Sequence, residues 1–342
     1  MSKKQIVLKD IANKLNVSTV TVSKALRDHP DISSETTRLV KKTASELGYS
    51  SNFMARNLSA RRSNTIGVVI PKIAHNFFSS IVEHIYSYAF DTNYEIILTV
   101  SQENSLRERK HIQTLVSNRV DGIIVSVSQE TKDNEIFEMV KAKGIPLLFM
   151  DRHHNISNVS TVTVDDRKGA YKTIDHAIKL GYRKIAHFAG CKNVNIGCER
   201  DLGFRQAMVD NGIEIKQEWI LEGGYEEKSG YSSFMKLYNQ KNLPDLIFAV
   251  TFPVALGVYM AARDVGIKIP EDVDLICFGN SDLSDLMVPS LSFVDQHPEQ
   301  IATKSLQTLI DNIDNKEGFK VQHIVIDTDL VLRGTCTKYN RN

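Results

Sequence analysis

The sequence lacks the features that mark secreted, membrane-spanning and zinc-binding proteins. Its four cysteines are scattered, form no C-x-x-C pair and have no histidine at the spacing of a zinc site. No apolar run approaches the roughly 20 residues that a membrane-spanning helix needs, and no apolar stretch of signal-peptide length follows the first lysines. We therefore expect a cytoplasmic protein whose cysteines are reduced and that binds no metal.

Motifs for nucleotide cofactors and for catalysis are also missing. No strand-like segment is followed by G-x-G-x-x-G, and G-x-x-x-x-G-K-[ST] does not occur. No nucleophile–base set and no paired carboxylates stand out. His153 and His154 lie in a polar loop, where solvation is a simpler interpretation than metal binding. The sequence predicts neither an enzyme nor a cofactor.

What is present is an ordinary globular composition with an uneven charge. The 342 residues are 42% hydrophobic and 24% charged, which is too apolar for a disordered chain and long enough for two or three domains. The net charge is only +1, yet residues 1–62 hold twelve lysines and arginines against five acidic residues. A basic head on a mildly acidic body indicates that the head meets a polyanion, although charge alone leaves a solvated basic face as an alternative.

Two short helices joined by a tight turn are expected in the basic head. Apolar residues at helical spacing predict a first helix over residues 8–15, and Asn16 tolerates the left-handed conformation of a turn. Ser18 is a good N-cap for a second helix over residues 19–26, and a third helix is expected after Ser33. This is the pattern of a helix-turn-helix; a packing module without DNA explains the apolar positions but not the polar face.

The second helix carries small polar side chains and a lysine on one face. Only the major groove of DNA admits a helix, and its base edges present a readable pattern of donors and acceptors. We expect Lys24 to donate to guanine, Thr19 to exchange hydrogen bonds with bases and Val20 to contact a thymine methyl group. The other polar side chains of this face are expected to bind phosphates and so to fix the position of the helix along the DNA. They are Ser18, Thr21 and Ser23.

After residue 64 the chain alternates apolar, β-branched runs with amphipathic helical patterns. Such alternation predicts an α/β body whose parallel sheets are covered by helices on both faces. The alternation falls into two similar series, which predicts two lobes with a ligand cleft at the carboxyl ends of their strands.

The head resembles the opening of the lactose-repressor/galactose-repressor (LacI/GalR) family of bacterial transcription regulators. The resemblance rests on residues 7–26 (VLKDIANKLNVSTVTVSKAL), residues 32–38 (ISSETTR), Leu47-Gly-Tyr49 and residues 52–58 (NFMARNL), and it continues through the chain. The family pattern is broken at three positions that are not expected to contact DNA: Val7, Asn16 and Ser51. Because Val7 replaces an N-cap threonine, the first helix is expected to lose about 1 kcal/mol.

The resemblance implies an all-α helix-turn-helix head and a two-lobed, periplasmic-binding-protein-like body with parallel doubly wound sheets. We expect a DNA-binding domain over residues 1–49, a hinge helix and linker over 50–63 and an effector-binding and dimerisation domain over 64–342. That domain is expected to have two lobes. The N-lobe is expected over about 64–163 and 293–322, and the C-lobe over about 164–292 and 323–336.

The hinge segment is short for a helix, since isolated helices of this length are marginal in water. A simple tether is therefore one interpretation. The resemblance implies that the hinge folds only on the operator, paired with its dimer mate in the minor groove, with Leu58 wedged between base steps. It places Asn52 and Arg56 against phosphates and groove edges.

The resemblance also places a small-molecule effector between the lobes. Arg200 matches an arginine that reaches ligand hydroxyls or carboxylates, and Arg152 ends a strand at the cleft. Phe77 packs either on the effector or on its own helix, and Tyr225 either stacks on the effector or is an ordinary surface tyrosine. The full set of expected effector contacts is Phe77, Arg152, Arg200, Tyr225, Thr251 and Asn280.

Two departures from the family pattern concern the effector. Phe252 and Gly279 stand where the family has aspartates that can grip sugar hydroxyls. A sugar is therefore not expected in its usual pose, and arginines without those acids suit an anionic or less hydroxylated ligand such as a sugar phosphate or sugar acid.

The sequence thus predicts a DNA-binding transcription regulator, most simply a repressor, that binds a palindromic operator as a homodimer under control of a sugar-derived effector. Residues 338–342 lack the apolar heptads of a tetramerising coil, which favours a dimer. The alternative from another class is a solute-binding or sensor protein of the same two-lobed fold without a role on DNA. A third hypothesis is a two-lobed enzyme, but the sequence shows no set of catalytic residues that would support it.

Overall fold

The computed structural model describes residues 6–26, 28–49, 62–280, 282–315 and 317–337. The expected hinge contacts Asn52, Arg56 and Leu58 lie outside the described residues. The chain divides into two compact units, residues 1–63 and residues 64–342. No helix in the described part of the chain combines the length and the apolar character that crossing a bilayer requires.

The described part of the first unit contains three helices in helix-turn-helix order. They are α1 (Leu8–Leu15), α2 (Thr19–Ala25) and α3 (Ser34–Glu46). Apolar side chains from all three form one small core: Ile11, Ala12, Val22, Ala25, Val40 and Ala44. The predicted turn is confirmed at Asn16, whose φ of 52° is left-handed.

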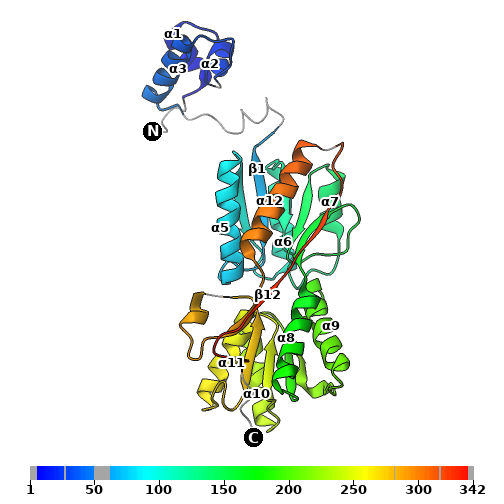
Figure 1. Cartoon of the computed structure of the whole chain (residues 1–342). Coiled ribbons are helices and arrows are strands. Elements are labelled where there is room, and N and C mark those ends of the chain that lie inside the picture. The colour runs from blue at the N-terminus through cyan, green and yellow to red at the C-terminus, as the bar shows by residue number, and fades with distance from the viewer. Residues whose placement is uncertain (1–5, 27, 50–61, 281, 316, 338–342) are drawn as a thin grey trace. The chain divides into compact units, whose positions relative to one another are not determined.

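The second unit has two lobes, each built on a six-stranded sheet (Figure 1). The first sheet has the order β11-β5-β4-β3-β1-β2 and the second has the order β12-β10-β9-β8-β6-β7. The strands of the first sheet are β1 (Thr65–Ile70), β2 (Glu95–Val100), β3 (Gly122–Val125), β4 (Leu147–Met150), β5 (Ser160–Val164) and β11 (His323–Ile326). Those of the second are β6 (Ile185–Ala189), β7 (Ile220–Glu222), β8 (Leu246–Ala249), β9 (Asp274–Phe278), β10 (Ser292–Asp295) and β12 (Asp329–Val331).

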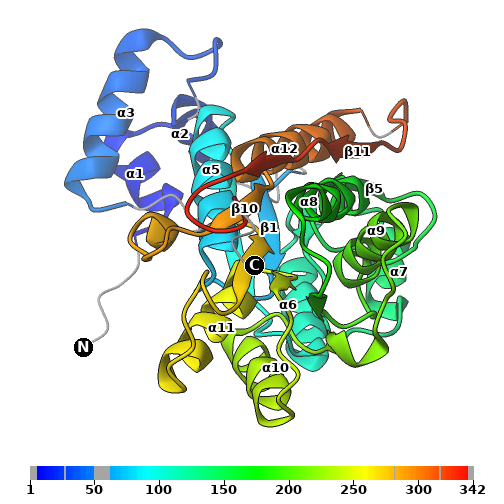
Figure 2. The same ribbon diagram turned by 60° about the horizontal axis from the view of Figure 1, so that its bottom comes forward.

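Helices cover the faces of both sheets, as the alternation of strands and helices predicts. In the first lobe α5 and α12 pack side by side, and α6 lies on β1 and β2 (Figures 1 and 2). In the second lobe the helices pack as two pairs, α8 with α9 and α10 with α11. The helices are α5 (Asn76–Asp91), α6 (Ser105–Ser117), α7 (Glu135–Ala142), α8 (Asp166–Leu180), α9 (Asn195–Asp210), α10 (Glu227–Asn239), α11 (Phe252–Asp264) and α12 (Pro298–Asp314), with 3₁₀ turns at Gln217–Trp219 and Asp282–Asp285.

The strand pairing corrects the lobe boundaries expected from the sequence. β10 pairs with β9 in the second sheet, so residues 293–295 belong to the C-lobe and not to the N-lobe. β11 pairs with β5 in the first sheet, so residues 323–326 belong to the N-lobe and not to the C-lobe. β12 then returns to the second sheet and runs antiparallel to β10, which is the exception to the expected parallel pairing. The reason is that each crossover is decided by pairing between distant segments, which leaves no local pattern in the sequence.

Candidate functional site

The start of α2 builds the candidate nucleic-acid interface. Ser18 is the N-cap, and its Oγ accepts a hydrogen bond from the backbone N–H of Thr21 at 2.9 Å. The hydroxyls of Ser18 and Thr21 are also 2.8 Å apart. Thr19 and Val20 are exposed, and 62% of the Val20 surface is open to solvent. Both side chains are therefore accessible at the start of α2.

Lys24 lies in the last turn of α2 and is already paired. Its Nζ is 2.7 Å from Oδ2 of Asp31, a residue between α2 and α3. The lysine lowers the pKa of the Asp31 carboxyl through a hydrogen bond and its charge. Ser23, the remaining predicted DNA contact, is half-buried on the same helix.

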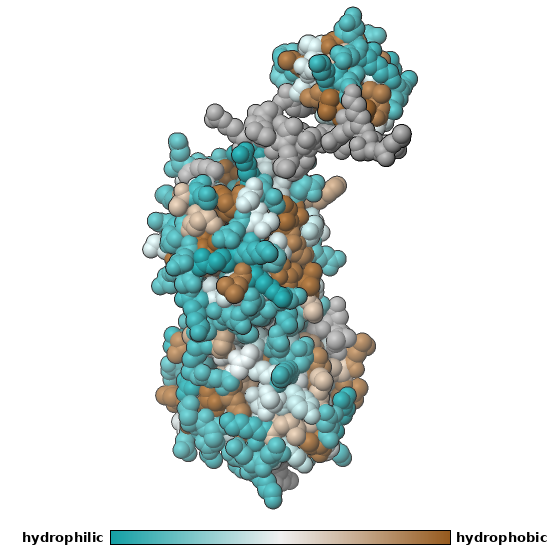
Figure 3. All heavy atoms as spheres, turned by 180° about the vertical axis from the view of Figure 1, so that it is seen from behind, coloured by the Kyte–Doolittle hydropathy of each residue, from teal (hydrophilic) through white to brown (hydrophobic). Residues whose placement is uncertain are grey.

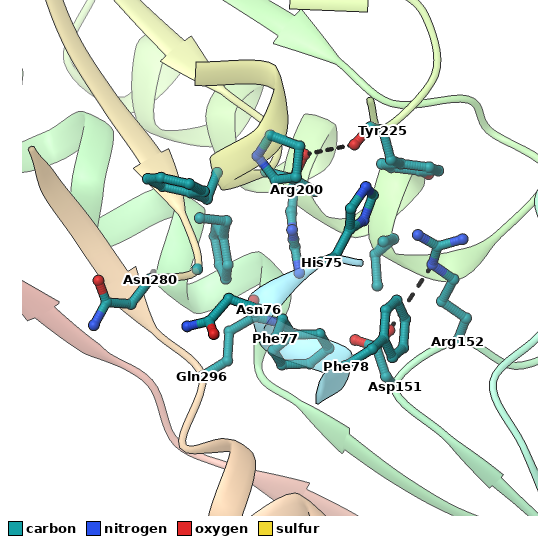
Figure 4. A pocket seen from close by; sticks show the side chains of 16 residues that line it. His75, Asn76, Phe77, Phe78, Asp151, Arg152, Arg200, Tyr225, Asn280 and Gln296 are labelled. Carbon is teal, nitrogen blue, oxygen red and sulfur yellow. Dashed lines mark hydrogen bonds and ion pairs between the residues drawn. The ribbon is translucent and has the colours of Figure 1, made fainter. Parts of the chain in front are cut away.

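A small cavity in the second unit collects all six residues that the sequence predicts around an effector. It measures about 50 Å³ and takes side chains from both lobes (Figure 4). Its lining residues are His75, Asn76, Phe77, Phe78, Asp151, Arg152, Ile196, Arg200, Tyr225, Thr251, Phe252, Pro253, Phe278, Gly279, Asn280 and Gln296. Most of them follow the carboxyl ends of parallel strands or begin the next helix, where ligands of such sheets bind.

Arg152 is fully buried after β4 and is balanced by carboxylates of its own lobe. Its Nη1 lies 2.8 Å from Oε1 of Glu103, and its Nε lies 3.8 Å from Oδ2 of Asp151. Its guanidinium carbon stands 4.5 Å from the centre of the Tyr225 ring in the other lobe, a cation–π contact that spans the cleft.

Arg200 is equally buried, and its charge is balanced within the second lobe. Its Nε donates to Oδ1 of Asp166 at 2.7 Å, and its Nη1 donates to the carbonyl oxygen of Val250 at 2.5 Å. Its guanidinium stacks on Phe278, 3.9 Å from the ring centre. Neither arginine therefore presents an unbalanced positive charge to the cavity.

Tyr225 lines the cavity but is tied into the protein on several sides. Its hydroxyl donates to the carbonyl oxygen of Cys191 at 2.8 Å, while Arg152 covers its ring. A methyl group on Gly190 would come within 2.1 Å of this ring, so glycine is needed there for the close approach. Tyr225 is thus a buried wall and not a surface tyrosine.

The other three predicted residues have mixed roles. Phe77 lines the cavity and also packs against the hydrophobic core, so its contact with an effector stays a prediction. Thr251 is the N-cap of α11, and its hydroxyl donates to the carbonyl oxygen of Tyr225 at 3.2 Å. Asn280 lies at the rim, after Gly279 (Figure 4).

Two cavity residues that the prediction left out carry polar groups of particular interest. Asp151 is buried, and its carboxylate makes only longer contacts, 3.5 Å to Ser126 and 3.8 Å to Arg152. Burial raises the pKa of Asp151 to about 6, against the lowering effect of the two arginines. Gln296 is also buried, and its Nε2 has no hydrogen-bond partner among the described residues. Asp151 directly precedes Arg152 in the sequence, and this neighbourhood could have identified it, but Gln296 lies in a crossover that has no sequence signal.

The positions of the missing family aspartates both face the cavity. Phe252 contributes an aromatic wall, and Gly279 adopts a φ of 80°. Because a left-handed backbone is strained for residues with a Cβ, an aspartate at 279 would be strained in this conformation.

The described residues hold no cluster of metal-ligating side chains. His153 and His154 differ from the expectation of solvation, because both are half-buried. The His154 ring bonds Oδ1 of Asn134 at 2.9 Å and the carbonyl oxygen of Thr131 at 3.1 Å, which gives it a structural role.

Comparison with known proteins gives matches over nearly the whole chain. Residues 7–52 match the bacterial regulatory proteins of the lacI family, and residues 63–331 match the periplasmic binding proteins and sugar binding domain of the LacI family. The HTH-type transcriptional repressor PurR of Vibrio vulnificus is 30% identical, with 97% of this chain and 99% of that protein covered. Catabolite control protein A of Priestia megaterium is 29% identical, with 89% and 91% covered.

Solved structures agree on the fold. The lac repressor dimer bound to operator and an anti-inducer superposes with a TM-score of 0.85 at 23% identity, over 97% of this chain and 99% of that chain. A complex of the transcriptional regulator CelR with cellobiose gives a TM-score of 0.74 at 24% identity, over 96% and 99%. The chain belongs to the LacI family of DNA-binding transcription regulators, which are not enzymes.

Proposed function

We propose that the protein is a cytoplasmic transcriptional repressor that binds a palindromic operator as a homodimer and responds to a small-molecule effector in the interlobe cavity. The observation that carries this proposal is the combination of an exposed polar face on α2 with a two-lobed body whose cavity collects all six expected effector residues. The family match and the relatives named as repressors support it.

Dimerisation is proposed because one helix-turn-helix reads too few base pairs for useful specificity. The body offers apolar surface that a second copy could cover: Figure 3 shows brown patches among the hydrophilic surface of both lobes. On α5, Phe90 is 83% exposed and Tyr86 is 45% exposed. In the second lobe, Leu286 and Val288 are 78% and 95% exposed.

Selection of bound duplexes from a random pool tests the operator. The expected product is an inverted repeat, and randomising one half-site should abolish specific affinity. A protein that binds one half-site as a monomer with equal affinity at physiological salt would contradict the proposal.

The hinge is proposed to fold on the operator with Leu58 as a minor-groove wedge, and Asn52 and Arg56 against phosphates and groove edges. Leu58→Ala should weaken operator binding, while effector binding to the body stays unchanged. Equal operator affinity in wild type and variant would make the hinge a simple tether.

The effector is proposed to be sugar-derived: a sugar, a sugar phosphate or a sugar acid. The cavity favours the uncharged member of this set, because Arg152 and Arg200 are already balanced by Glu103 and Asp166, and Asp151 adds a further carboxylate. A thermal-shift screen with a hexose, its 6-phosphate and its aldonic acid compares ligands that differ mainly in charge. Stabilisation by the anions alone would reverse this preference.

The alternative, a solute-binding or sensor protein without a role on DNA, makes a different prediction. Removing residues 1–62 should abolish DNA capture if the head binds DNA. If the full chain selects no sequence from the random pool but still binds a ligand, the sensor function is favoured.

A further inference from the structure

The candidate base-reading lysine of α2 is held by an acidic residue outside the helix. Lys24 Nζ and Asp31 Oδ2 are 2.7 Å apart, and both side chains are partly exposed. Asp31 is itself positioned by His29, whose Nδ1 accepts the backbone N–H of Asp31 at 3.3 Å and lies 3.4 Å from the carboxylate. The ammonium group that would meet the DNA is thus already bound to a carboxylate.

A second ion pair in the same unit provides a natural comparison. Asp28 accepts from Nζ of Lys41 at 2.6 and 2.7 Å. Asp28 and Asp31 stand in the same segment between α2 and α3, and each is exposed and paired with one lysine. The difference is that Lys41 belongs to α3, whereas Lys24 belongs to the helix whose polar face is exposed.

We propose that Asp31 is a specificity-determining residue for DNA binding: its carboxylate holds Lys24 away from phosphates, so that the lysine transfers only to a base edge with well-placed acceptors. This inference rests on the proposed operator binding by α2. Guanine presents two acceptors, O6 and N7, in the major groove, whereas phosphates are present on every sequence.

The proposal follows from how specificity arises. Specificity is a difference between two affinities, so weakening the interaction with random DNA raises it as effectively as strengthening the operator contact. On random DNA, Lys24 gains little by leaving Asp31 for a phosphate, and the charge of Asp31 repels the backbone. On the operator, Lys24 leaves the Asp31 carboxylate for a base edge with well-placed acceptors. The new contact offsets the lost ion pair, so Asp31 leaves the affinity for the operator nearly unchanged. Asp31 therefore acts mainly on the non-specific complex.

The test compares full-length Asp31→Asn with the matched control Asp28→Asn. Each variant removes one negative charge from the same segment of the head. Fluorescence anisotropy measures the affinity for the selected operator and for a random duplex at one salt concentration. We expect Asp31→Asn to bind the random duplex about two- to fivefold more tightly, the range for one exposed ion pair, with a smaller gain on the operator. Asp28→Asn should strengthen both complexes equally.

The Lys24→Ala background separates pairing from general electrostatics. There, Asp31→Asn should lose its preferential effect on random DNA and behave like Asp28→Asn. Asp31→Ser removes the carboxylate without an amide and should reproduce Asp31→Asn, and circular dichroism checks that each variant is folded.

Two results would overturn the inference. One is an equal gain on operator and random DNA for Asp31→Asn, which would make Asp31 a general repulsive charge. The other is an unchanged consensus for Lys24→Ala, which would show that Lys24 reads no base even though the operator is bound. Failure of the proposed function gives a different outcome, since wild type would then prefer no sequence at all.

Discussion

Arg200 is a buried cation whose partner is buried with it. The Arg200–Asp166 pair has side-chain exposures of only 1% and 3%. Removing one member of such a pair leaves an uncompensated charge in the interior, which costs about 3–5 kcal/mol. The pair therefore ties the candidate effector site to the stability of the second lobe.

Arg200→Ala should accordingly lower the thermal midpoint of the full chain, and not only remove an effector contact. The double variant Arg200→Ala/Asp166→Asn should recover much of the loss, because no buried carboxylate is left without a cation. Arg263→Ala, at an exposed position, is the control. Equal destabilisation in the single and double variants would show that packing, and not charge, sets the cost.

Glu108 is a buried carboxyl group whose protonation depends on its surroundings. It is fully buried, and its carboxyl oxygens accept from the backbone N–H of Ser128 at 2.6 Å and the hydroxyl of Thr131 at 2.7 Å. Burial raises its pKa from 4.5 to about 7, more than the two hydrogen bonds lower it. Between these two values the folded state binds more protons than the unfolded state, so stability falls as the pH rises through this window.

Glu108→Gln should remove this pH dependence, because the amide cannot ionise. We expect the variant to be more stable than wild type by about 1–3 kcal/mol at about pH 8, and of similar stability at about pH 5. Thermal unfolding at both pH values measures this, with the exposed Glu95→Gln as control. The same pH profile in wild type and Glu108→Gln would contradict the raised pKa.

At the scale of the element, the two helices of the helix-turn-helix differ in how they begin. The N-cap of α2 is Ser18, whose side chain accepts the N–H of Thr21. The N-cap of α1 is Val7, which offers no side-chain acceptor. Only the reciprocal contact is made there, with Oδ2 of Asp10 accepting the N–H of Val7 at 2.9 Å. α1 therefore begins with half of a capping box.

Val7→Thr should complete this box and stabilise α1 by about 1 kcal/mol, and Ser18→Ala should destabilise α2 by a similar amount. Hydrogen exchange of the two helices in the full chain reports each effect separately. Slower exchange in α1 is expected for the first variant and faster exchange in α2 for the second. Because Ser18 is both the N-cap of α2 and a predicted phosphate contact, the DNA affinity of Ser18→Ala has to be compared with its exchange rates.

Across the body, hydrogen bonds and an ion pair join the two lobes at the cleft. Asn195, at the start of α9, accepts the N–H of His153 at 2.9 Å and donates to the carbonyl oxygen of Asp151 at 3.0 Å. Lys72 and Glu226 add an ion pair of 2.7 Å across the cleft. An effector shifts the balance of closed and open forms only through its different affinity for the two.

Asn195→Ala removes two of these contacts and should shift the equilibrium toward the open form. With about 1 kcal/mol for each hydrogen bond, the ratio of the two forms should change by more than tenfold. Small-angle X-ray scattering should show a larger radius of gyration than for wild type. Asn211→Ala, whose amide bonds within one lobe, is the control, and identical scattering curves for all three proteins would refute the prediction.

Local sequence patterns were enough to predict the helices of the head and the residues that surround the cavity. Helix periodicity is local, so residues three and four apart reveal the buried face of α1 and the exposed face of α2 without the rest of the fold. Side chains that follow parallel strands must meet at one edge of a sheet, which is why the six expected effector residues line one cavity.

Long-range contacts in the folded chain set which charges are balanced and which lobe the strands β10, β11 and β12 join. Glu103 and Arg152 form an ion pair although they are 49 residues apart in the sequence. β11 pairs with β5 although more than 150 residues separate them. Such contacts are set by three-dimensional proximity and leave no periodic trace in the sequence. The absence of the two family aspartates is visible in the sequence, whereas the carboxylates that pair with Arg152 and Arg200 are identified only once the chain is folded.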